Sequence, residues 1–292
     1  MVKISIEEKS GFCFGVTRVI SQAEEILDTG EKLYCLGQIV HNESEVKRLV
    51  AKGIIFIEKE DLQRLHNVKV LIRAHGEPPE TYQVAEKNNI ELIDGTCPIV
   101  KKLQKKIRQT WDNGGENSQV IIYGKKDHPE VVGLTGQTGN HAIVISGPGA
   151  LKNLRLSGNV SLYSQTTMDT DGFNQLRDEL KERMGKNTDK PGQLDIHDTI
   201  CRHISHRQPG IRKFAGENDV IIFVAGKKSS NGRVLFDVCR SVNSRSYLVS
   251  FPEELNREWI ENASSVGVCG ATSTPRWLLE EVAGKIREFT KN

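Results

Sequence analysis

The sequence lacks C-x-x-C pairs, a signal-like N-terminus and any apolar run long enough to cross a bilayer. The longest apolar runs, such as Val220–Ala225, are far shorter than the roughly 20 residues of a membrane helix. Forty basic and 38 acidic side chains give a net charge of +2, which does not indicate nucleic acid as the main partner. We therefore expect a cytoplasmic protein that binds neither membrane nor nucleic acid.

The cysteine content excludes a disulfide scaffold. Six cysteines in 292 residues are too few for the dense framework of a small secreted domain, and a reducing compartment keeps such cysteines as thiols or metal ligands. With 37% apolar and 27% charged residues, the chain has the composition of a globular protein with two or three domains.

Short β-branched runs alternate with amphipathic segments along almost the whole chain, which predicts a parallel α/β fold. The polar stretch Gly185–Gln193, GKNTDKPGQ, is the expected linker. The clearest helical segments are Gly15–Ile26, Pro98–Trp111, Thr170–Met184, Arg207–Glu217 and Pro275–Lys291. Eleven strands are expected in the runs KISI, KLYCLG, IIFI, VKVLIRA, IELID, QVIIYG, AIVIS, VSLYS, DVIIFVA, RSYLVS and SVGVCGA.

Three cysteines differ from the others because each follows a strand-like or loop segment and opens a helix. Cys13, Cys97 and Cys201 lie 84 and 104 residues apart, about one in each third of the chain. This spacing suggests three related α/β units that each present one thiol, and a thiol at a helix N-terminus is favoured as thiolate. Cys35, Cys239 and Cys269 lie inside apolar runs and are expected to be buried hydrophobic residues.

Three such thiols could hold an iron–sulfur cluster with one iron left open. Zinc fits less well, because the local C-x-x-C or H-x-x-x-H pairs typical of zinc sites are missing. The alternative is that the three cysteines are unrelated core or capping residues, and their spacing alone leaves that alternative open.

Polar side chains follow strand-like runs at many positions, and ligands of open α/β sheets collect beyond the carboxyl ends of strands. The set is rich in hydrogen-bond donors and has a single carboxylate, which suits a diphosphate. Each residue also has an ordinary structural explanation, such as helix capping at Ser229 or Glu130. The residues are His41, His75, His128, Glu130, Thr166, Thr167, Ser229, Ser230, Asn231 and Ser273.

The sequence contains no complete nucleotide-binding motif among the two candidates. The GKKS at Gly226 has Ile221 where a P-loop requires a glycine, and GPGALK at Gly147 lacks the third glycine of a dinucleotide fingerprint. A redox reaction would therefore need electrons from outside the chain.

The motifs GFCFGV, VHN, RAHG, TCP, HPEVVG, SQTT, C-x5-RQ, SSN and TSTP, in this order from Cys13 to Pro275, resemble those of the 4-hydroxy-3-methylbut-2-enyl diphosphate reductase family. The resemblance implies three pseudo-threefold-related α/β domains, arranged as a trefoil around a central iron–sulfur cluster. We expect domains at 14–97, 98–193 and 194–292, joined by an N-terminal strand at 1–13.

The implied reaction is reductive dehydroxylation of (E)-4-hydroxy-3-methylbut-2-enyl diphosphate to isopentenyl and dimethylallyl diphosphate, the last step of the methylerythritol phosphate pathway. The resemblance makes Cys13, Cys97 and Cys201 ligands of one 4Fe-4S cluster with an open apical iron, which would bind the substrate hydroxyl. Glu130 would donate the proton, and Thr166 would orient the hydroxyl and relay protons. An external one-electron donor, a ferredoxin or a flavodoxin, would supply the electrons. The residues implied to hold the diphosphate are His41, His75, His128, Ser229, Ser230, Asn231 and Ser273.

Two other functions remain open at this point. A quinolinate synthase would also use three cysteines and a cluster, but it is a condensing and dehydrating enzyme and not a reductase. The HPE and SSN runs argue against it. A non-enzymatic iron–sulfur sensor would need no diphosphate pocket.

Overall fold

The computed structural model describes residues 2–114, 118–147, 149–185, 192–227 and 229–291. The chain folds into two compact units, Met1–Phe56 together with His206–Asn292, and Ile57–Ser205. The strands form three four-stranded sheets, and every strand pair whose register is known is parallel. The expected α/β class is therefore confirmed. The division into three domains stays a prediction.

The first sheet contains both the N-terminal strand and the C-terminal strands, in the order β1-β12-β10-β11. Its strands are β1 Lys3–Ile6, β10 Val220–Val224, β11 Ser246–Val249 and β12 Ser265–Gly270. The helices around it are α9 Arg207–Gly216, α10 Ser230–Val242 and α11 Arg276–Lys291, with the 3₁₀ turns η3 Pro252–Glu254 and η4 Arg257–Ile260.

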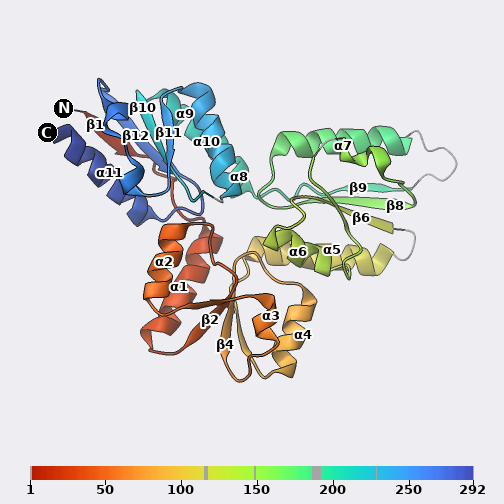
Figure 1. Cartoon of the computed structure of the whole chain (residues 1–292). Coiled ribbons are helices and arrows are strands. Elements are labelled where there is room, and N and C mark those ends of the chain that lie inside the picture. Colours follow the sequence, from red (N-terminus) through yellow and green to blue (C-terminus); the bar gives the residue numbers. More distant parts are fainter. Residues whose placement is uncertain (1, 115–117, 148, 186–191, 228, 292) are drawn as a thin grey trace. The chain divides into compact units, whose positions relative to one another are not determined.

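Strand β10 shows why this sheet is covered on both faces. All five of its residues are buried, and successive strand side chains point to opposite faces. Ile222 packs in a cluster with Leu279 of α11, whereas Phe223 packs in a second cluster with Ile211 of α9 and Leu235 of α10. Figure 1 shows the sheet between α11 on one side and α9 and α10 on the other. An uninterrupted apolar strand is typical of such a doubly covered parallel sheet.

The second sheet has the order β7-β6-β8-β9. Helix α7 covers one face of it, and α5 and α6 cover the other (Figure 1). Its strands are β6 Ser118–Tyr123, β7 Ile143–Ile145, β8 Asn159–Ser164 and β9 Leu194–Ile196. The helices of this region are α5 Pro98–Gly114, α6 Pro129–Gly136, α7 Thr170–Gly185 and α8 Arg202–Ser205, with the 3₁₀ turn η2 Ala150–Asn153.

The third sheet has the order β3-β2-β4-β5. Its strands are β2 Leu33–Leu36, β3 Ile55–Ile57, β4 Lys69–Ile72 and β5 Glu91–Asp94. The helices that alternate with them along the chain are α1 Phe14–Asp28, α2 Glu43–Ala51, α3 Lys59–Leu62 and α4 Pro79–Lys87.

The five helices expected from the sequence are confirmed, with ends within three residues of the expected ones. All eleven expected strands are present, but β9 was missed. Residues 186–191, which make up most of the expected linker, lie outside the described residues. No helix among the described residues has both the length and the apolar character needed to cross a membrane.

Candidate active site

A buried carboxyl group lies in the first turn of α6. Proline begins this helix, and Glu130 follows it with only 2% of its surface exposed. The backbone N–H of Thr166 donates a hydrogen bond to Glu130 Oε1 at 2.6 Å, and the Thr166 hydroxyl donates to Oε2 at 2.7 Å. The loop that follows β8 therefore holds both oxygens of the carboxylate.

The environment of Glu130 extends its protonated form toward neutral pH. Burial raises the pKa of the Glu130 carboxyl from its usual value near 4.5 to about 7, and the two hydrogen bonds from Thr166 oppose part of that rise. A carboxylic acid with a pKa near 7 is matched to proton donation under physiological conditions. Glu130 and Thr166 thus form a buried, hydrogen-bonded pair.

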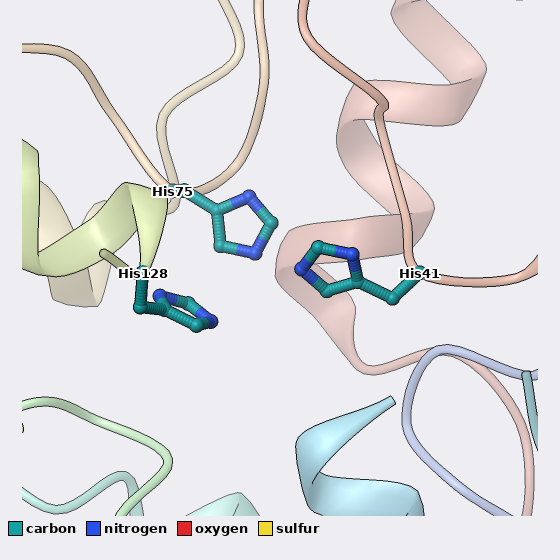
Figure 2. Close-up of side chains that lie close together, drawn as sticks. All are labelled: His41, His75 and His128. Carbon is teal, nitrogen blue, oxygen red and sulfur yellow. The ribbon is translucent and has the colours of Figure 1, made fainter. Parts of the chain in front are cut away.

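His128 caps the same helix. Its Nδ1 accepts a hydrogen bond from the Glu130 backbone N–H at 3.1 Å, so the neutral ring carries its proton on Nε2. His75 meets this ring edge-on, with ring centroids 5.3 Å apart and planes 80° apart. Figure 2 shows the two imidazoles together and also labels His41, which belongs to the other unit.

Glycines allow the loop that carries His75 to pack closely on its neighbours. Gly76 has a φ of +73°, and a β-carbon there would lie 2.6 Å from Gln104 Nε2. At Gly133 of α6, a β-carbon would lie 3.0 Å from the same amide and 3.3 Å from the Gly76 carbonyl oxygen. Gln104 in turn donates a hydrogen bond to the Glu77 carbonyl at 3.2 Å. This packing sets His75 beside the helix that begins with His128.

A second polar group lies in the other unit, at the carboxyl ends of β10 and β12. Ser229 caps α10 by accepting a hydrogen bond from Gly232, and the hydroxyls of Ser229 and Ser273 lie 3.1 Å apart. Asn231 Nδ2 donates to the Thr272 hydroxyl at 2.9 Å. The two loops that carry these expected diphosphate ligands are therefore hydrogen-bonded to each other.

His41 follows β2 and lies against the first of these loops. A β-carbon on Gly226 would lie 2.3 Å from the His41 carbonyl oxygen, so only glycine permits this backbone contact. The side chain of Ser230 lies outside the described residues. Thr167 is only partly buried, and its hydroxyl accepts a hydrogen bond from Gln165 rather than contacting Glu130.

The three cysteines Cys13, Cys97 and Cys201 occupy equivalent places in the three sheets. Each follows an edge strand, β1, β5 or β9, whose parallel neighbour is β12, β4 or β8. Each cysteine N–H donates to a carbonyl two residues beyond the end of that neighbour: Cys13 to Thr272 at 3.3 Å, Cys97 to Ala74 at 3.0 Å and Cys201 to Thr166 at 2.9 Å.

This repeated contact joins each thiol to a loop with an expected ligand-binding residue. Thr272 precedes Ser273, Ala74 precedes His75, and Thr166 is itself one of these residues. All six cysteines are present as thiols. The three in the repeat are partly exposed, whereas Cys35, Cys239 and Cys269 are fully buried, as expected from their apolar surroundings.

Sequence reasoning missed several contributors to the site. Thr272, Gly76 and Gly133 lie in the TSTP, RAHG and HPEVVG runs but were given no role of their own, and Gln104 lies outside every motif. All four hold other residues in place, which only the contacts in the structure reveal. Arg207 was noted only as part of C-x5-RQ. It is 7% exposed and contacts Glu7, Ser10 and the Gly270 carbonyl, beneath the segment that leads to Cys13.

The fold and these residues define an α/β protein in which strand ends present thiols, imidazoles, hydroxyls and a carboxyl group with a pKa of about 7. The LytB protein family model matches residues 4–287. The chain belongs to the LytB family.

Relatives share this assignment over their full length. The chain is 50% identical over 283 residues to a Phocaeicola vulgatus protein named 4-hydroxy-3-methylbut-2-enyl diphosphate reductase, covering 96% of this chain and 97% of the relative. It is 48% identical over 293 residues to a Bacteroides thetaiotaomicron protein of the same name, covering 100% of both.

Two solved structures have the same fold. One, described as (E)-4-hydroxy-3-methyl-but-2-enyl diphosphate reductase, the terminal enzyme of the non-mevalonate pathway, is 34% identical with a TM-score of 0.73, covering 99% of this chain and 100% of that one. The E-1-hydroxy-2-methyl-but-2-enyl-4-diphosphate reductase of Plasmodium falciparum is 26% identical with a TM-score of 0.83, covering 97% and 87%.

Proposed function

We propose that this chain is a 4-hydroxy-3-methylbut-2-enyl diphosphate reductase, which converts its substrate to isopentenyl and dimethylallyl diphosphate. The observation that carries the proposal is the buried Glu130–Thr166 pair, because the reaction requires an acid that gives a proton to a departing hydroxyl group. The substrate's C–O bond breaks and its hydroxyl leaves as water. An electron pair and a second proton enter the allylic fragment, at either end of it, to give the two products.

Glu130 holds the first proton, on the oxygen that faces the Thr166 hydroxyl. In the ionised state, Thr166 donates to both oxygens of the carboxylate. Once Glu130 is protonated, its O–H can donate to Thr166 Oγ1, and the threonine hydrogen is then released to point toward the substrate oxygen. Thr166 thereby orients the substrate hydroxyl and relays the proton to it. Burial also excludes bulk water from this transfer, since Glu130 is only 2% exposed.

The diphosphate is held by hydrogen-bond donors at the strand ends. His128 offers Nε2–H because its Nδ1 is already occupied by a backbone N–H, and His75 lies beside it. Ser229 and Ser273 offer hydroxyls that lie together, and Asn231 is fixed by Thr272. His41 and Ser230 complete the proposed set. The diphosphate lies away from the bond that breaks, so the binding energy of its contacts can be used to orient the reacting hydroxyl.

We assign one 4Fe-4S cluster to Cys13, Cys97 and Cys201, with the fourth iron open. Their chemistry fits, because three partly exposed thiols occupy equivalent strand-end positions and the remaining three are buried. Zinc is disfavoured by the absence of any C-x-x-C pair in the sequence. When bound, the cluster supplies electrons one at a time and Lewis acidity toward the substrate hydroxyl. The electrons come from a ferredoxin or a flavodoxin.

Product formation in the absence of oxygen tests the proposal. The cluster is reconstituted in the wild type, in Glu130→Gln and in Glu281→Gln, which changes an exposed glutamate and serves as the control. Iron and sulfide are counted, and each protein receives reduced methyl viologen with the hydroxylated allylic diphosphate. We expect both products from the wild type and the control, and a loss of about 10²-fold or more in Glu130→Gln. A fully loaded wild type that forms neither product would overturn the assignment.

A further inference from the structure

An open groove of about 420 Å³ lies between α5 and the segment that leads from β9 into α8. One wall consists of Ile99, Lys102, Leu103 and Lys106, whose spacing places them on one face of α5. The other wall consists of residues 198–203, and it includes Cys201. The groove therefore reaches from the surface to a proposed ligand of the cluster.

The walls of this groove are cationic. Lys102, Lys106 and Arg202 are basic and exposed, His203 lies next to them, and Asp198 is the only carboxylate in the lining. Lys102 and Lys106 form no ion pair with any other described residue. On the flank of the same helix, by contrast, Lys101 pairs with Asp94.

The positive charge is local to this helix. Five of the eight residues from 101 to 108 are basic, although the whole chain carries a net charge of only +2. Ile99, in the lining of the groove, is 38% exposed and adds an apolar contact. A small apolar centre inside a field of one sign is typical of transient electron-transfer interfaces, which bury little area and gain association rate from electrostatic steering.

We infer that this groove is the docking surface for a small acidic one-electron carrier protein. The inference rests on the proposed function, which requires outside electrons because the sequence has no flavin or nicotinamide motif. A donor seated here would lie against Cys201, and its acidic surface would complement the two lysines of α5. The lysines act by binding the carrier and take no part in the chemistry at the substrate.

Charge reversal in the groove tests this assignment. The double variant Lys102→Glu/Lys106→Glu is compared with Lys152→Glu/Lys181→Glu, an equal charge change at two exposed lysines of the same unit. One of these control lysines lies on η2 and the other on α7, which covers the opposite face of the second sheet from α5 (Figure 1). The probe is an acidic 2Fe-2S ferredoxin in its oxidised form. Its dissociation constant from each cluster-loaded protein is measured by calorimetry at low ionic strength.

We expect the groove variant to bind ferredoxin about tenfold or more weakly than the wild type, and the control to stay within about twofold. Added salt should weaken binding to the wild type much more than binding to the groove variant. Turnover with reduced methyl viologen should be the same in all three proteins. Equal ferredoxin binding by groove variant and control would overturn the inference, and so would equal loss in both. A wild type that binds ferredoxin but yields no product with the chemical reductant would instead contradict the proposed function.

Discussion

Replacing Glu130 with glutamine should change the stability of the protein in a pH-dependent way. Glutamine has the shape of a protonated glutamate and can keep both contacts with Thr166, but it cannot ionise. Below pH 4.5, Glu130 is protonated in both the folded and the unfolded chain, so the wild type and the variant should be similarly stable. Between pH 4.5 and about 7, the unfolded chain loses this proton while the folded protein keeps it. The wild type therefore loses stability as the pH rises, and the variant does not.

The size of the effect follows from the two pKa values. A folded pKa of about 7 against 4.5 corresponds to about 3 kcal/mol in the free energy of unfolding, because a tenfold change in proton affinity is worth about 1.36 kcal/mol. The difference in the free energy of unfolding between Glu130→Gln and the wild type should therefore be about 3 kcal/mol larger above pH 8 than at pH 4.5, in favour of the variant.

Urea unfolding of both proteins without cluster, from pH 4.5 to 8.5 with reductant present, measures this difference. Because the two proteins are compared at each pH, the contributions of other titrating groups to the free energy of unfolding cancel in the difference. The exposed-site control Glu281→Gln should differ from the wild type by less than about 0.5 kcal/mol at every pH. A difference between wild type and Glu130→Gln that is constant across this range would refute the argument that burial holds Glu130 protonated.

Three further changes probe the rest of the site. Thr166→Val removes a hydroxyl whose hydrogen bond lowers the pKa of Glu130, so a carbon-13 NMR titration should find that pKa above its wild-type value of about 7, with kcat reduced. Gly76→Ala places a β-carbon 2.6 Å from a neighbouring amide at a φ of +73°, so steady-state kinetics should show KM for the diphosphate rising several-fold, with a smaller change in kcat. Arg207→Met leaves Glu7 buried without its cation, which should cost about 3–5 kcal/mol in urea unfolding, and Glu7→Gln in the same chain should recover part of that loss.

The sequence was sufficient for the elements with strong periodicity. Strand β10 is a continuous apolar run, and α5 and α11 have long amphipathic patterns that begin at or just after a proline, so their type and their starts could be predicted. The end of α5 lies three residues beyond the expected Trp111. Strand β9 could not be predicted, because it has only three residues and none of them is fully buried. Its place in the sheet depends on pairing with β8, about 30 residues earlier in the chain.

The sequence proposes a set of site residues but does not give their arrangement. A polar residue after a strand can be read from the sequence, whereas the partner of each residue depends on tertiary packing. Glu130 illustrates the difference. Its helix-start position follows from the neighbouring proline, but the burial that raises its pKa and its hydrogen bonds with Thr166, 36 residues further on, both depend on tertiary packing. The glycine contacts at 76, 133 and 226 are likewise visible only once the loops lie against each other.

The most direct test of the central claim is the pH dependence of a single turnover, measured with cluster-loaded protein, a chemical reductant and the hydroxylated allylic diphosphate. If Glu130 gives its proton to the departing hydroxyl, the rate of product formation in the wild type should fall as the pH rises through about 7. The small residual rate of Glu130→Gln should lack this transition. The same fall with pH in both proteins, or equal rates, would contradict the assignment of Glu130 as the acid.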